Sequence, residues 1–91
     1  MAMMTVNGQR LQAHLEALAD IARTPDGICR LSYSDSFWKS NAYVAQLMRE
    51  AGMSVTTNPV GNVVGTYPGR SPTKITIGSH IDSVVNGGIF I

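Results

Sequence analysis

The sequence predicts an α/β fold built from two helices, a β-hairpin and a further strand. In the first half, two stretches repeat apolar residues at helical spacing, and from Met53 onward apolar and polar residues alternate. A run rich in β-branched residues follows at 74–78 (KITIG) and predicts a central rather than an edge strand. The 91 residues have room for one small domain, residues 1–91.

The first helix is predicted between Asn7 and the turn residues 24–27 (TPDG). Asn7 is a favourable N-cap, and the turn sequence ends a helix strongly. The apolar stripe consists of Leu11, Leu15, Leu18 and Ala22. His14 lies off this stripe with no acidic or thiol neighbour at ligand spacing, so we interpret it as a solvated helix histidine.

A second helix is predicted after the capping cluster at residues 34–36 (SDS). Its apolar stripe consists of Val44, Leu47, Met48 and Ala51. Gly52 stands where a left-handed residue ends a helix. Three aromatic residues, Phe37, Trp38 and Tyr43, form either a binding surface or packing. We favour packing, with two of the three covering the sheet.

The second half predicts a hairpin over residues 53–67. Residues 53–58 form a strand half-buried through Val55 and Thr57, residues 58–62 form the turn, and residues 63–67 return. Residues 68–73 (PGRSPT) form a surface loop.

Composition excludes several classes of partner. The net charge is +1 and the seven Lys and Arg residues are scattered, which argues against nucleic acid. No apolar run approaches the ~20 residues of a membrane span, and the start lacks a secretory signal pattern. Cys29 is the only cysteine, which fits a cytoplasmic protein, and we interpret it as a structural thiol. The low charge predicts a surface that is buried against more chain or a partner.

The residues that carry chemistry follow the predicted strand at 74–78. His80 and Asp82 are two apart, so on extended backbone both side chains point to the same face. A metal site requires an imidazole ligand and a nearby carboxylate that orients it. Ser83 and the turn at residues 86–88 (NGG) carry the chain away from this site. The alternative is a histidine that bonds a carboxylate for structural reasons alone.

Nearly the whole chain, in order, resembles a known family. The run ITIGSHIDSVVNGGIF is similar to the first metal-site segment of the amidase, hydantoinase and carbamoylase family. RLQAHLEALADIARTPDGICRLSYSD resembles the opening helix and G-x-x-R-L stretch of that family, and AYVAQLMREAGMSVTTNPVGNVVGTYPGR resembles its second helix and hairpin. These enzymes are related to aminoacylase and carboxypeptidase metallopeptidases. The resemblance implies the N-terminal portion of a zinc-peptidase-like α/β catalytic domain.

The resemblance also implies roles for two residues. His80 would be a ligand of one of two divalent metal ions, zinc or manganese, and Asp82 would be the catalytic carboxylate that orients the site. The metal ions would activate water for attack on an amide or ureido carbonyl. Small-molecule substrates of the family are N-carbamoyl-L-amino acids and ureides such as allantoate.

The chain departs from the family pattern at Ile91. The family has an aspartate there that bridges both metals, and an aliphatic side chain cannot replace it. The later Glu-Glu pair, the remaining ligands and the inserted domain are also missing. We therefore expect neither tight metal binding nor hydrolysis by these 91 residues alone, and interpret the chain as a truncated reading frame or a fragment.

Two other functions stay open. The first is a non-catalytic module that self-associates, or binds a partner, through an exposed sheet edge at residues 74–80. The second, and weaker, is a small metal-binding protein in which His80 from two or more chains meets at an interface.

Overall fold

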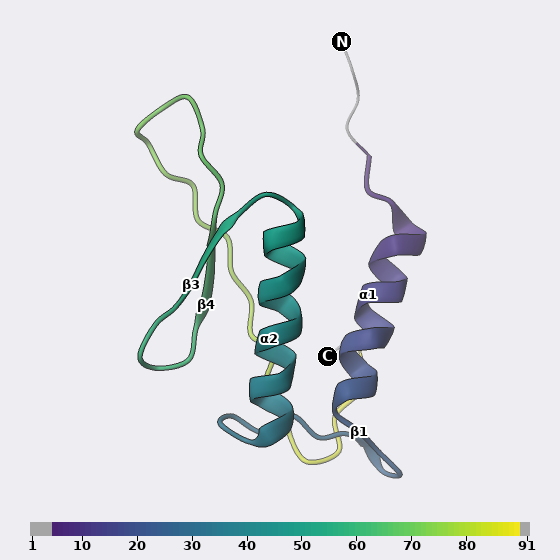
Figure 1. Cartoon of the computed structure of the whole chain (residues 1–91). Helices are drawn as coiled ribbons and strands as arrows, with labels where there is room; N and C mark the ends of the chain where they lie inside the picture. The colour runs from purple at the N-terminus through teal and green to yellow at the C-terminus, as the bar shows by residue number, and fades with distance from the viewer. Residues whose placement is uncertain (1–4, 90–91) are drawn as a thin grey trace.

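A computed structural model describes residues 5–89 of the chain. The elements in chain order are α1 (Gly8–Ile21), β1 (Arg23–Thr24), β2 (Gly27–Ile28), α2 (Asp35–Glu50), β3 (Ser54–Thr57) and β4 (Val63–Thr66). The two helices run antiparallel side by side, with the β3–β4 hairpin beside α2 (Figure 1). Two helices and two antiparallel strand pairs confirm the predicted α/β class.

Helix α1 begins and ends close to the predicted positions. The Asn7 side chain accepts a hydrogen bond from the Arg10 amide at 3.0 Å, and the helix ends at Ile21. Ala19 and Ala22 are buried and form a small core with Ile28. His14 is half-buried rather than solvated, because it lies on the side of α1 that faces α2. Its ring meets that of Tyr43 edge-on, with centroids 6.5 Å apart.

Helix α2 is capped as predicted. Ser34 accepts a hydrogen bond from the Phe37 amide, and Gly52 adopts φ 90° directly after the C-cap residue Ala51. The predicted stripe is only half-buried, and its last residue, Ala51, is exposed. The fully buried positions of α2 are Ser40, Asn41 and Ala45.

The predicted hairpin is confirmed. Strands β3 and β4 pair antiparallel, from Ser54 opposite Thr66 to Thr57 opposite Val63. Val55 is half-buried as expected, whereas Thr57 is exposed. Phe37 and Trp38 cover the turn, since a Cβ on Gly61 would lie 3.3 Å from the Trp38 ring and 3.5 Å from that of Phe37. Two of the three aromatic residues of α2 therefore pack against the hairpin, as predicted.

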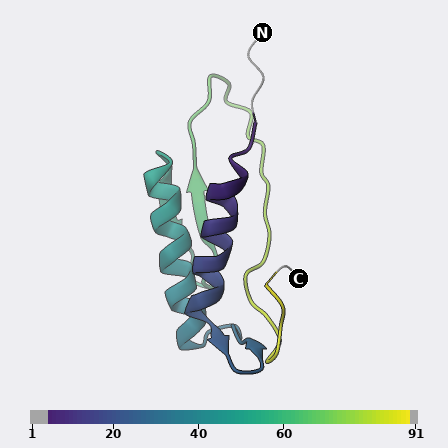
Figure 2. The ribbon, with the colours of Figure 1, turned by 90° about the vertical axis from the view of Figure 1, so that its right-hand side faces the viewer.

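The strand predicted at residues 74–78 is not formed. This segment follows the loop at 68–73 and runs without a paired strand down the length of the molecule (Figure 2). Ile75 and Ile77 are each 93% exposed. A strand requires a hydrogen-bonded neighbour, and within residues 5–89 no other strand pairs with this segment.

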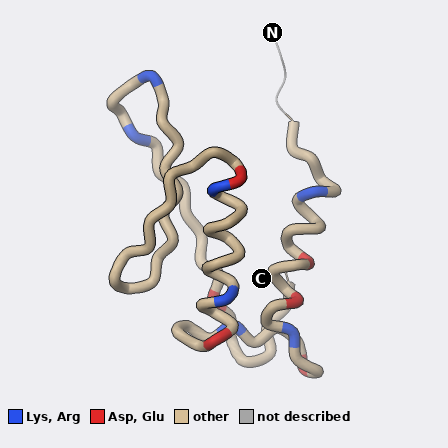
Figure 3. Tube along the Cα trace, in the orientation of Figure 1, with Lys and Arg blue, Asp and Glu red and all other residues tan. Residues whose placement is uncertain are grey.

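Charge is spread thinly over this fold. Basic and acidic residues are scattered over the helices and loops, without a stripe of either sign in the part of the chain that is described (Figure 3). Neither helix within residues 5–89 is both long enough and apolar enough to cross a bilayer.

Candidate functional site

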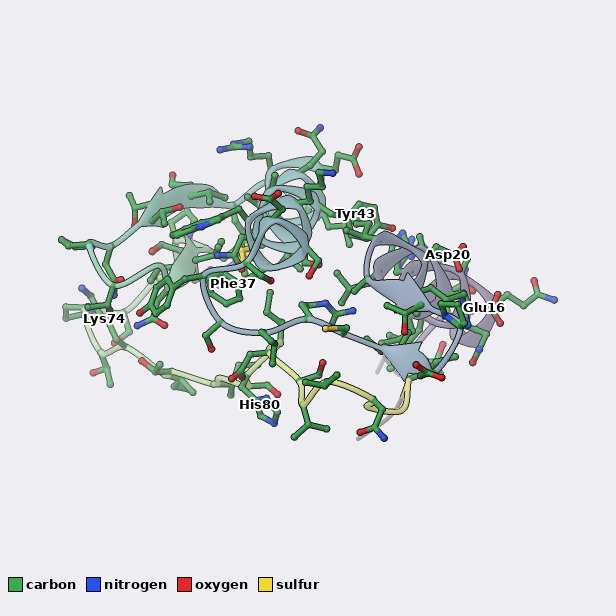
Figure 4. All side chains as sticks on the ribbon, turned by 90° about the horizontal axis from the view of Figure 1, so that it is seen from below. Glu16, Asp20, Phe37, Tyr43, Lys74 and His80 are labelled. Atoms are coloured by element: carbon green, nitrogen blue, oxygen red, sulfur yellow. The ribbon has the colours of Figure 1, made fainter. Side chains whose placement is uncertain are left out.

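The structure brings His80 and Asp82 into direct contact, as their spacing predicts. The Nδ1 atom of His80 lies 3.1 Å from Asp82 Oδ1 and 3.0 Å from the Asp82 carbonyl oxygen. Both side chains reach solvent, with 68% of the His80 side chain and 45% of the Asp82 side chain exposed. Seen from below, His80 lies on the side of the C-terminal segment away from the two helices (Figure 4). This site is therefore open.

This contact determines which nitrogen of the ring carries the proton. Both atoms that face Nδ1 are hydrogen-bond acceptors, so Nδ1 must be the donor. In the neutral ring Nε2 then keeps its lone pair. A carboxylate or carbonyl that fixes the tautomer in this way is the usual partner of a metal-binding histidine.

Asp82 uses its second oxygen as well. Ser32 Oγ donates a hydrogen bond to Asp82 Oδ2 at 2.9 Å. This bond is the largest cause that holds the pKa of Asp82 below its ordinary value. It outweighs partial desolvation of the carboxylate, and the contact with His80 lowers the pKa further. Asp82 is therefore an ionised acceptor at neutral pH.

Residues 28–32 and 81–87 lie alongside each other, and we call this pairing the clasp. Ile28 and Gly87 exchange two backbone hydrogen bonds of 2.8 Å, and the Ser83 amide donates to the Arg30 carbonyl at 2.8 Å. Ser83 Oγ accepts from the Arg30 amide at 2.8 Å. A turn follows Ser83 at residues 85–86, earlier than the predicted 86–88, because Gly87 pairs with Ile28. The clasp fixes the backbone at Asp82, and His80 lies directly before the clasp segment 81–87 in the chain.

Arg30 ties the clasp to helix α1. Its Nη1 donates to the Ile81 carbonyl at 2.8 Å, and its Nη2 donates to the Leu18 carbonyl at 3.0 Å. The residue is 8% exposed, and burial lowers the pKa of its guanidinium. Sequence reasoning gave neither Arg30 nor Ser32 a role, although Arg30 is the arginine of the G-x-x-R-L stretch in the family resemblance. A second local signal is an arginine inside the otherwise apolar run ICRL.

The donor set at this site consists of one imidazole and one carboxylate. Within residues 5–89, no three His, Cys, Asp or Glu side chains gather closely enough to hold a metal ion. Ile91, the predicted departure from the family pattern, lies outside the described residues. His80 fits the role of a single ligand through Nε2, and a four-ligand site needs further donors.

A separate hollow of about 660 Å³ lies between the start of α1 and the end of α2. Arg10, His14 and Glu50 line it, and no residue of the clasp does. It is therefore not part of the His80 site.

Comparisons with known proteins show what the chain is similar to. No family model matches the chain. The chain is 42% identical over 93 residues to an N-carbamoyl-L-amino-acid amidohydrolase from Pseudomonas sp. (strain NS671), a match that covers 99% of the chain and 22% of the relative. It is 36% identical over 78 residues to an allantoate amidohydrolase from Bacillus subtilis, covering 82% of the chain and 19% of that relative.

A solved structure shares the fold. A hydantoinase/carbamoylase family amidase from Burkholderia ambifaria superposes with a TM-score of 0.89 at 34% identity, over 98% of this chain and 23% of that protein. Fold and sequence both match one segment of amidohydrolase and amidase relatives. More narrowly, the chain belongs to the hydantoinase/carbamoylase family, and it spans 22% of the length of its Pseudomonas relative. The predicted resemblance is confirmed.

Proposed function

We propose that this chain supplies His80 and Asp82 to the metal centre of an amidohydrolase that acts on linear amides. The substrates we propose are N-carbamoyl-L-amino acids or ureides such as allantoate, in keeping with the names of the relatives. One observation carries the proposal. His80 Nδ1 faces two acceptors of Asp82, so the exposed ring presents Nε2 as a ligand atom.

Each residue has a distinct role in this proposal. His80 would hold one of two zinc or manganese ions through Nε2. Asp82, which is ionised at neutral pH, keeps the ring in the Nδ1–H tautomer, so that Nε2 keeps its lone pair for the metal. A divalent metal ion, when bound, acts as a Lewis acid and activates water near neutral pH.

We further propose that the remaining ligands come from outside these residues. Zinc is held by four donors in closed sites and by three protein donors in catalytic ones. Since His80 and Asp82 supply one imidazole and one carboxylate, we expect the 91 residues alone to bind zinc weakly and to hydrolyse none of these substrates. A cytoplasmic location is also part of this proposal, because a single half-buried cysteine, Cys29, fits a reducing compartment.

A chimera tests the proposed function. Residues 1–91, carrying Ile91→Asp, replace the aligned segment of the Pseudomonas N-carbamoyl-L-amino-acid amidohydrolase. We expect this chimera to hydrolyse N-carbamoyl-L-amino acids. The version with Ile91 should be far less active, because it lacks the bridging carboxylate expected there.

The two histidines of the chain provide a matched pair of variants. His80→Ala in the chimera should reduce kcat/KM by more than the about 10- to 100-fold that is typical when a partner of a metal ligand is lost. His14→Ala, at the interface of the helices, should keep most of the activity if circular dichroism shows an intact fold. Equal activity of the His80→Ala chimera and its parent would refute the proposal.

A second candidate function is self-association through the unpaired segment at 74–78. The observation that favours it is the 93% exposure of both Ile75 and Ile77 on a β-prone segment. Sedimentation velocity at tens of micromolar should show species larger than the 9.8 kDa monomer. Ile75→Lys with Ile77→Lys should restore the monomer, and Val6→Lys, at another exposed apolar position, should not. A monomer alone in the unmodified chain would contradict this candidate.

A further inference from the structure

We propose that Arg30 and Ser32 are positioning residues of the His80 site. Arg30 sets the course of the backbone through residues 81–83, and Ser32 sets the rotation of the Asp82 carboxylate. The inference rests on the proposed function, because it takes His80 and Asp82 as the groups to be positioned. Neither residue touches a reacting atom. Each acts through the clasp.

The environment of Arg30 indicates a positional role. The guanidinium is buried among backbone carbonyls, and no carboxylate of residues 5–89 pairs with it. Its Nε has no hydrogen-bond partner among the described residues. Burying an unpaired charge is unfavourable, so an apolar residue would be the better choice if this position only filled space. What an arginine adds is a rigid fork of donors.

That fork joins two distant parts of the chain. Nη2 reaches the Leu18 carbonyl in the last turn of α1, and Nη1 reaches the Ile81 carbonyl. Ile81 stands between His80 and Asp82. Because the Ile81 carbonyl belongs to the peptide plane that leads into Asp82, holding it restricts the dihedral angles on which the His80–Asp82 contact depends.

The backbone of Arg30 holds the next residue. The Ser83 amide donates to the Arg30 carbonyl, and the Arg30 amide donates to Ser83 Oγ, both at 2.8 Å. Arg30 therefore contacts residues 81 and 83, on either side of Asp82. No other described residue donates hydrogen bonds to both of these positions.

Ser32 completes the arrangement at the side chain. Its hydroxyl donates to Asp82 Oδ2, while Oδ1 faces His80 Nδ1. The carboxylate is thus held at both oxygens, and its plane is directed at the imidazole. Hydrogen bonds to a carboxylate that orients a metal-binding histidine have this effect in known metal sites.

The test reads the tautomer of His80 by long-range ¹⁵N–¹H NMR on the metal-free, 91-residue chain. The unmodified chain should show mainly the Nδ1–H form. Arg30→Lys keeps the charge but cannot reach two carbonyls with a fixed fork, so it should shift His80 toward a mixture of tautomers. Ser32→Ala should do the same, whereas Ser32→Thr keeps the hydroxyl and should keep the tautomer. Arg49→Lys, on the exposed end of α2, is the control.

A second measurement needs no variant at Arg30. In the unmodified chain the Nη protons of Arg30 should exchange with solvent more slowly than those of the exposed Arg49. This comparison tests the two hydrogen bonds of the Arg30 guanidinium even if Arg30→Lys fails to fold. Equally fast exchange would overturn the part assigned to Arg30. A wild-type tautomer in folded Ser32→Ala protein would overturn the part assigned to Ser32.

The chimera separates this inference from the proposed function. Ser32→Ala in the active chimera should lower kcat about 10-fold with little change in KM, and Ser32→Thr should restore it. If the chimera is inactive while the tautomer shifts as expected, the positioning roles hold and the proposed function fails. If the chimera is active and the tautomer is unchanged in Arg30→Lys and Ser32→Ala, the positioning roles fail alone.

Discussion

Asp82 is the residue on which the contacts of the site converge. One carboxylate oxygen accepts from Ser32, and the other faces His80. Because both contacts favour the charged form, the pKa of Asp82 lies below its ordinary value. Ser32 lies 50 positions before Asp82 in the sequence, and His80 lies two positions before it.

The lowered pKa fixes the direction of the pH dependence. A carboxyl group with a depressed pKa in the folded state contributes stability above its unfolded pKa, which is about 3.9 for aspartate. That contribution is lost as the pH falls through the lower, folded value. Ser32→Ala should therefore raise the pKa of Asp82 toward the ordinary value, as measured by ¹³C NMR titration of the carboxyl group. Ser71→Ala, in the loop at 68–73, should leave it unchanged. An identical titration in Ser32→Ala would contradict the assigned cause.

Gly27 is the residue that allows the clasp to close. It adopts φ +133°, and a Cβ there would lie 2.8 Å from the Gly87 carbonyl oxygen. We expect Gly27→Ala to lower the free energy of unfolding by about 1–3 kcal/mol, through strain and loss of the Ile28–Gly87 pairing. Urea denaturation measures this change. Gly69→Ala, which meets no atom within 4 Å, should change stability little. Equal stability of the two variants would contradict the account.

At the scale of elements, the start of α2 follows a sharp turn. Tyr33 adopts φ 65°, a left-handed value uncommon for a bulky residue. Its hydroxyl donates to the Val60 carbonyl at 2.8 Å, and its ring lies against Phe37 and Trp38. This turn lets Ser32 face Asp82 while Ser34, two residues on, caps the helix.

Ser34 is predicted to carry much of the stability of that helix start. Its hydroxyl accepts from the Phe37 amide and donates to the Leu31 carbonyl at 2.6 Å. Ser34→Ala should cost about 1 kcal/mol, in the range measured for N-caps. Thermal unfolding followed by circular dichroism checks this, with Ser54→Ala in the exposed β3 as control. A cost no greater than that of Ser54→Ala would show that the cap matters little.

Local signals account for what the sequence predicted well. Caps, apolar spacing and turn residues act within a few positions, so both helices and the hairpin lie where Asn7, Ser34 and Gly52 indicate. The strand at 74–78 failed because pairing depends on neighbours that local sequence does not encode. Arg30 and Ser32 were missed for the same reason, since their partners Ile81 and Asp82 lie 51 and 50 positions away. The His80–Asp82 contact was predictable because both residues stand on one short segment.

At the scale of the whole molecule, the described residues form two layers. The helices and the hairpin lie on one side, and the C-terminal segment lies on the other, joined to them through the clasp (Figures 2 and 4). The His80 site sits on that outer segment and is open to solvent. An open site of this kind agrees with our proposal that the chain contributes ligands to a metal centre completed by residues from elsewhere.

The most direct test of this account is the metal content of the Ile91→Asp chimera, measured by elemental analysis with and without His80→Ala. We expect His80→Ala to remove about one zinc or manganese ion per chain, because zinc and similar ions lose a site when an imidazole ligand is removed. His14→Ala should keep the full content. A His80→Ala chimera that folds and retains all its metal would show that His80 is not a ligand.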